Sequence, residues 1–66
     1  MFKVYDATNK QTIKTFASKK SARVFCSKLV KHSDRWSKVS PDTFKRFSHN
    51  ATSGVARFDD IQIVPA

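Results

Sequence analysis

The basic side chains in residues 18–33 have the types and spacing needed to bind a polyanion. At about 100° per residue, four of them fall on one side of a helix, where they could lie along the phosphates of a nucleic acid. They are Lys20, Arg23, Lys28 and Lys31. A solvated helix face normally interleaves Glu with Lys, because opposite charges four residues apart are mildly stabilising. This range contains no acidic residue, which favours a polyanionic partner over a merely solvated face.

A second group of cations alternates with aromatic residues further along the chain. In proteins that bind single strands, aromatic rings stack on bases while cations hold the phosphates. The alternative is that the aromatic side chains fill the core of a small domain. That alternative is the stronger one for Phe44 and Phe47, whereas Trp36 lies in a polar context. The candidate binding residues of this group are Arg35, Trp36, Lys38, Lys45 and Arg46.

Few groups in the sequence could carry catalysis. Asp59 and Asp60 would project to opposite faces of a strand, so they do not form a carboxylate pair. Cys26 lies on the apolar side of the expected helix, where it would pack as a small hydrophobe. With one Gly and two His, neither a phosphate-cradling loop nor a zinc site is expected. We therefore expect no enzyme, with no catalytic residues, no cofactor, no metal and no small-molecule substrate.

Length and charge narrow the class of protein. The chain has 66 residues, which makes one small domain and is too short for a two-domain enzyme or a dinucleotide-binding unit. Apolar residues make up 39% and aromatic residues 12%, enough for a compact core. Thirteen Lys and Arg face five acidic residues, all Asp, so the formal net charge is +8. Residues 1–66 are expected to form a single small basic domain.

Neither secretion nor membrane insertion is expected. The single Cys26 excludes an internal disulfide framework. No apolar stretch long enough for a signal peptide follows Met1, and the longest uninterrupted apolar run covers only residues 24–26. We expect a cytoplasmic protein that has no membrane partner.

Helices and strands must position the candidate residues. The first two expected elements show a clear periodic pattern of apolar and polar residues. Residues 1–17 alternate between apolar and polar residues on either side of Thr8-Asn9-Lys10, which predicts a β-hairpin with Asn in the turn. Residues 18–33 carry an apolar stripe at helical spacing after a capping Ser18, which predicts the main helix.

The second half of the chain has weaker signals. Residues 34–39 show no period and predict a loop. Ser40-Pro41-Asp42-Thr43 has the residues of a helix start, so a short helix is expected over 41–48, with Phe44 and Phe47 on one face. A polar stretch then predicts an exposed loop over 48–54. Residues 55–64 have strand character, interrupted at Asp59-Asp60 by either a bulge or a tight turn.

These elements predict an α+β fold. A small antiparallel sheet, formed by the N-terminal hairpin and the C-terminal strand or strands, packs on one main helix in the order β-β-α-(short α)-β. The residues expected to supply most of the core are Phe2, Val4, Ile13, Phe16, Phe25, Leu29, Ile61 and Ile63.

The stretch from Thr15 to Phe25 resembles a strand-to-helix junction found in many small α+β modules. Among these are the sheet-plus-helix domains of phage integrases that bind DNA arm sites. In those domains three strands precede the helix, whereas two are expected here, so the resemblance transfers no residue roles and names no family.

Taken together, the sequence predicts a small, basic, non-enzymatic protein that binds nucleic acid, either DNA or RNA, through a Lys and Arg helix face. The chief alternative is a small adaptor or inhibitor, of the kind that bacteriophages encode, which binds an acidic surface of a host or partner protein. Either partner would be attracted by the excess positive charge.

Overall fold

The computed structural model of the protein describes residues 1–50 and 54–66 and contains one helix and five strands in that part of the chain. The order of elements is β-β-α-β-β-β. Their bounds are β1 Phe2–Asp6, β2 Gln11–Phe16, α1 Lys19–His32, β3 Trp36–Ser40, β4 Thr43–Asn50 and β5 Val55–Pro65.

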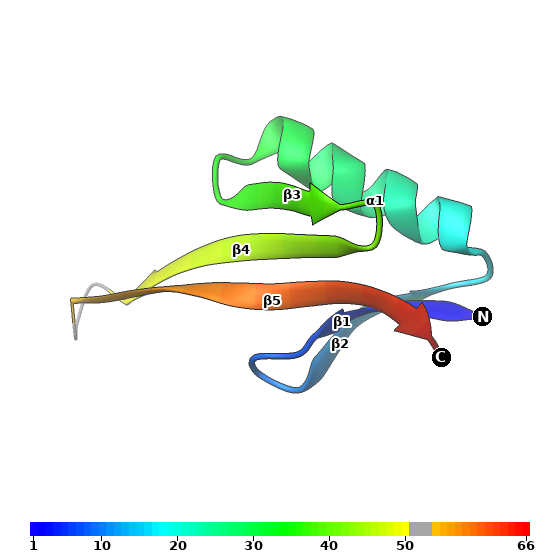
Figure 1. Ribbon diagram of the computed structural model, residues 1–66, viewed down its shortest axis with the longest axis horizontal. Coiled ribbons are helices and arrows are strands. Elements are labelled where there is room, and N and C mark those ends of the chain that lie inside the picture. The colour runs from blue at the N-terminus through cyan, green and yellow to red at the C-terminus, as the bar shows by residue number, and fades with distance from the viewer. Residues whose placement is uncertain (51–53) are drawn as a thin grey trace.

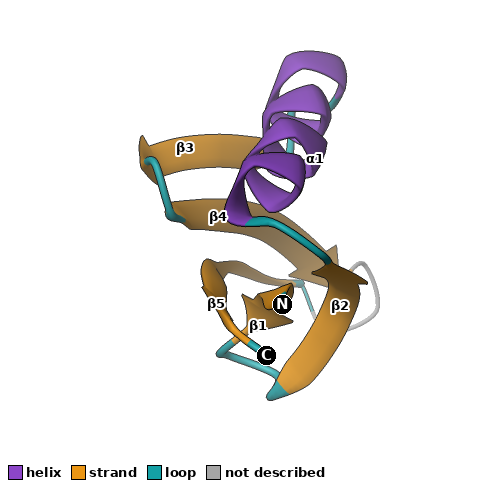
Figure 2. Ribbon diagram, turned by 90° about the vertical axis from the view of Figure 1, so that its right-hand side faces the viewer, coloured by secondary structure: helices purple, strands orange, loops and turns teal. Residues whose placement is uncertain are grey.

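All neighbouring strands pair antiparallel in one sheet, whose strand order is β2-β1-β5-β4-β3. The C-terminal strand β5 is therefore central, between the two hairpins. The sheet curves, and α1 lies on one face of it, between the edge strands β3 and β2 (Figure 2). The α+β class, the antiparallel sheet and the packing on one main helix were predicted correctly, whereas the predicted order β-β-α-(short α)-β is wrong.

The expected hairpin and main helix are both confirmed. Ser18 has an extended backbone and its Oγ accepts a hydrogen bond from the Ser21 N–H at 3.2 Å, which caps α1. In the hairpin turn, however, Lys10 adopts the left-handed conformation, with φ 55°. Asn9 instead uses its backbone and side-chain N–H groups to bind Asp6, at 3.0 and 2.7 Å.

The predicted loop 34–39 and short helix 41–48 are both wrong, because this region forms β3 and β4. Pro41 and Asp42 make a two-residue turn between the strands. The fixed φ of Pro suits the first central position of a turn as well as the first position of a helix, so the same residues fit both. On a strand, Phe44 and Phe47 lie on opposite faces instead of sharing one.

The C-terminal region forms one uninterrupted strand. Its register with β4 advances one residue at a time through Asp59-Asp60, so neither a bulge nor a turn occurs there. The prediction that these two residues face opposite ways is confirmed, since Asp59 is buried and Asp60 is exposed. The predicted loop 48–54 is wrong for residues 48–50, which extend β4, and its residues 51–53 lie outside the described residues.

The core lies between α1 and the sheet. Three residues of the predicted core are buried, as expected: Val4, Ile61 and Ile63. Four more pack against the buried cluster, as expected: Phe2, Ile13, Phe16 and Phe25. Leu29 is only half-buried and lies outside this cluster. The fully buried apolar cluster is Val4, Ala22, Cys26, Phe44, Ile61 and Ile63.

Candidate nucleic-acid interface

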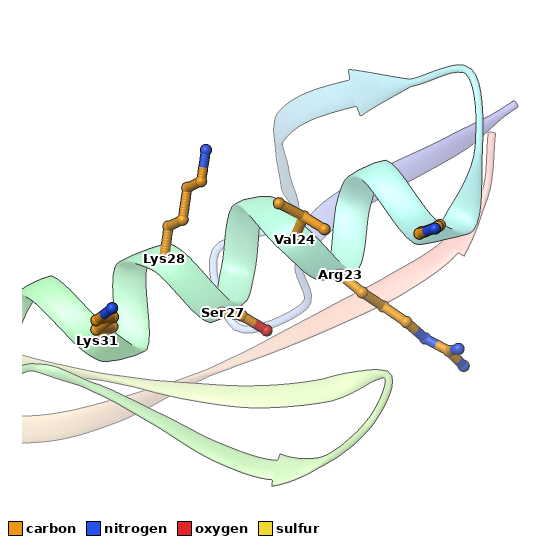
Figure 3. Close-up of a pocket in the computed structure, with 6 residues that line it drawn as sticks. Arg23, Val24, Ser27, Lys28 and Lys31 are labelled. Carbon is orange, nitrogen blue, oxygen red and sulfur yellow. The ribbon is translucent and has the colours of Figure 1, made fainter.

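The four cations predicted on the helix do share one surface of α1. Together with Val24 and Ser27 they line a shallow hollow of about 280 Å³ on the side that faces away from the sheet. Arg23 and Lys28 project on either side of Val24 and Ser27 (Figure 3). We call the set Lys20, Arg23, Lys28 and Lys31 the basic stripe. The first turn of α1 contains no acidic residue to offset it.

One member of the basic stripe is held by an acidic residue from the sheet. The Arg23 Nε donates a hydrogen bond to Asp42 Oδ1 at 2.8 Å, and Lys19 Nζ lies 3.3 Å from Asp42 Oδ2. The hydrogen bond from Arg23 lowers the pKa of Asp42 and raises the pKa of Arg23 itself. The β3–β4 turn is thereby tied to α1, and Arg23 has less freedom to meet a partner than the three lysines.

Three of the other four acidic residues bind cations outside the stripe, and the fourth, Asp34, is exposed three residues after Lys31. Asp60 pairs with Lys45 at 3.4 Å, while Asp6 and Asp59 are buried and bind arginines of β4 and β5. Among the described residues, the cations that form no ion pair are Lys3, Lys10, Lys14, Lys20, Lys28, Lys31, Arg35 and Lys38. Three of these eight, Lys20, Lys28 and Lys31, belong to the basic stripe.

The second predicted group is divided between an edge strand and its neighbour. Arg35, just before β3, and Lys38, within β3, are exposed at one edge of the sheet. Trp36 is half-buried against the core, and the Arg46 guanidinium lies 5.9 Å from its ring centre. Lys45 is exposed on the opposite face of β4 from Arg46. These five residues therefore do not form one continuous surface.

Arg46 lies at the centre of a buried charge network. Its Nη2 donates to Asp6 Oδ2 at 2.7 Å and to Asp59 Oδ2 at 2.9 Å. Arg57 extends the network, since its Nε lies 3.3 Å from Asp59 Oδ1 and its Nη2 donates to the Asn9 side-chain oxygen at 2.9 Å. The network joins the β1–β2 turn to β4 and β5, so the guanidinium of Arg46 supports the fold.

Burial alone would raise the pKa of Asp6, because a charged carboxylate is costly away from water. Hydrogen bonds from the side chain and backbone of Asn9 and the positive charge of Arg46 outweigh that effect. The pKa of Asp6 is therefore below its usual value of 3.8, and the carboxylate stays ionised.

An aromatic pair is the feature that the sequence did not reveal. Phe47 and Phe58 are directly opposite across β4 and β5, with ring centroids 5.4 Å apart in an edge-to-face arrangement. Both lie on the sheet face that points away from α1, because their neighbours Arg46 and Asp59 point toward the core side. The pairing would follow from the sequence only if β4 and its register with β5 were already known.

Cys26 has the position expected of a packed thiol. It is fully buried in the core cluster, and burial raises its pKa to about 11, so little thiolate forms at neutral pH. In the described part of the chain, no group of three or more His, Cys or Asp side chains is placed to hold a metal ion.

No family model matches the chain, and no curated protein and no solved structure matches it significantly. Within residues 1–50 and 54–66, no helix has the length and apolar character required to span a bilayer.

Proposed function

We propose that this protein binds nucleic acid, with the basic stripe of α1 contacting phosphates. The observation that carries the proposal is a solvent-facing row of cations, three of which have no ion pair within the described residues, around a shallow hollow. Of the acidic residues, Asp42 pairs with Arg23 of the stripe, while Asp6, Asp59 and Asp60 pair with cations of β4 and β5. Only Asp34 is in no ion pair within the described residues. A surface kept positive in this way attracts a polyanion and releases its condensed counterions on binding.

The geometry sets the size of the effect. If the four side chains each neutralise one phosphate, the logarithm of the affinity for duplex DNA falls with the logarithm of salt at a slope of roughly −3 to −4. Arg23 contributes least, because it must leave or share Asp42 to reach a phosphate. Phosphate contacts carry no base information, so the affinity is similar across unrelated sequences.

The test compares two double variants with the same change in charge. Lys20→Glu with Lys31→Glu reverses two cations of the stripe, whereas Lys10→Glu with Lys14→Glu reverses two on the β1–β2 hairpin. We expect the stripe variant to bind labelled DNA and RNA more weakly and to lose about two units of salt slope. The hairpin variant should lose much less, because its lysines lie outside the stripe.

Two results would contradict the proposal. Equal losses from the two double variants would mean that only net charge matters, and that the stripe is not the contact surface. If the parental protein binds neither DNA nor RNA at about 50 mM salt, nucleic-acid binding itself is wrong. An acidic protein partner would then be identified by capture from lysate that survives nuclease treatment and is lost in the stripe variant.

A further inference from the structure

The sheet face opposite α1 carries exposed aromatic rings. The side chain of Phe58 is 56% exposed although it contacts Phe47, and Tyr5 is half-exposed on the same face. In the described part of the chain α1 is the only helix, so no second layer covers this face. Large apolar side chains gathered on an open surface are typical of a binding site.

The rings are exposed because the strands turn their charged residues inward at this point. Arg46 and Asp59 are directly opposite each other and point to the core side, which forces Phe47 and Phe58 to the open side. A sheet built only for stability would have the reverse orientation, with rings buried and charges in water. The exposed pair is therefore not explained by the requirements of the core.

Cations lie near the aromatic pair and further along the same face of the sheet. The Phe47 N–H donates to the Arg35 carbonyl at 2.7 Å, which makes the exposed Arg35, just before β3, the neighbour of Phe47 at the sheet edge. Lys45 lies two residues before Phe47 on the same face and pairs with Asp60 at 3.4 Å. Further along the face, the Lys3 ammonium lies 4.9 Å from the centre of the Tyr5 ring. Rings and cations in this mixture suit a ligand with both bases and phosphates.

The basic stripe runs along most of α1, from Lys20 to Lys31, and only its C-terminal end lies toward the end of the molecule at which β4 ends and β5 begins (Figure 1). Lys31 is the last cation of the stripe, one residue before α1 ends, and Arg35 follows four residues later. The C-terminal end of α1 and the far end of the β4–β5 hairpin point the same way (Figure 1). A chain of phosphates that leaves the stripe would therefore pass Arg35 before it reaches the rings.

We propose that the bound nucleic acid is single-stranded, and that its bases stack on Phe58 and Phe47 while Arg35 and the basic stripe hold its phosphates. The inference rests on the proposed function and adds the class of nucleic acid. A duplex keeps its bases stacked inside and cannot offer them to the rings. A second copy of this chain is a poor occupant, because each copy carries a net charge of +8.

The experiment measures the affinity of an oligothymidylate of about 16 nucleotides and of a duplex of the same length, by fluorescence anisotropy at several salt concentrations. The parental protein should bind the single strand more tightly. Phe58→Ala should lower that affinity about 5- to 150-fold, which is the usual loss for one stacked base, and leave the salt slope unchanged. Val39→Ala is the matched control, because Val39 is 57% exposed and lies at the other end of β3.

Two further variants separate stacking from general apolar contact. Phe58→Tyr keeps an aromatic ring and should bind like the parent, whereas Phe58→Leu keeps only an apolar side chain and should lose affinity. Thermal unfolding of each variant should remain cooperative near the parental midpoint, since Phe58 lies outside the core cluster.

The outcomes distinguish the two proposals. If Phe58→Ala or Phe58→Leu binds the single strand as well as the parent, stacking is overturned, while loss of binding in the stripe variant would leave the proposed function standing. Equal or tighter binding of the duplex by the parent also overturns the single-strand proposal. If the parent binds neither probe, both proposals fall together.

Discussion

The α1 side of the sheet has two regions of opposite character. In the apolar region, Val4, Phe44, Ile61 and Ile63 are buried against α1. In the charged region, the next inward positions of the same strands hold Asp6, Arg46 and Asp59, which are joined by hydrogen bonds of 2.7 and 2.9 Å. The apolar region gains stability by removing surface from water, whereas the charged region must first recover the cost of desolvating its carboxylates.

The difference between the two regions shows how a small domain can place aromatic side chains on its surface. The charged region satisfies its inward positions with ion pairs, and its outward positions then hold Phe47 and Phe58. The apolar region shows the usual orientation, and its outward neighbours on β4 and β5 include Lys45, Asp60 and Gln62. The three predictions that follow alter one region at a time.

The largest effect is expected in the apolar region. Phe44 is 1% exposed and is among the largest fully buried side chains, so Phe44→Ala should cost about 3–5 kcal/mol. A core of this size supplies a total stability on the order of 3–5 kcal/mol, so the variant should be largely unfolded at room temperature. Circular dichroism during thermal unfolding measures this. A cooperative transition near the parental midpoint would mean that the strand assignment of residues 43–50 is wrong.

The next effect is expected in the charged region. Arg46→Met removes the shared partner of Asp6 and Asp59 and leaves two buried carboxylates without it. Because the Arg46 side chain is 31% exposed, the cost should be about 2–3 kcal/mol, below the range for a fully buried pair. Denaturant unfolding measures the loss. Adding Asp6→Asn and Asp59→Asn to Arg46→Met should recover part of the lost free energy of unfolding. If nothing is recovered, the charge network is not the source of the loss.

The smallest effect is expected on acidification. The pKa of Asp6 is lowered in the folded protein, so its ionised form stabilises the fold at pH values above the usual pKa of 3.8. That stability is lost as the pH falls through the lower folded pKa. The free energy of unfolding should therefore decrease with acid more steeply in the parental protein than in Asp6→Asn. Equal slopes below pH 4 would mean that Asp6 is not held by Asn9 and Arg46.

The elements that could be predicted from the sequence are those in which polarity follows the period of the backbone. The hairpin 1–17 alternates cleanly and residues 18–33 have a continuous apolar stripe, so both were predicted correctly. In β4 and β5 the alternation is reversed halfway, because Arg46 and Asp59 face inward. That reversal concealed β4 and made the phase of β5 look broken at Asp59-Asp60.

The two candidate surfaces also differ in how much of each could be predicted from local sequence patterns. Helical spacing was enough to place the basic stripe, because every member lies on one element. The pairing of Arg23 with Asp42 joins residues 19 positions apart in the sequence and depends on the β3–β4 turn. The pairing of Phe47 with Phe58 depends on the register of two strands. Neither contact can be derived until the tertiary arrangement is known.

The central position of β5 has a consequence for how the protein is made. The hairpins β1–β2 and β3–β4 pair with each other only through β5, which is the last of the described strands to leave the ribosome. Until it emerges, each hairpin exposes an unpaired inner edge, and isolated two-stranded hairpins are only marginally stable. The sheet therefore closes late, by contacts between distant parts of the chain that form slowly.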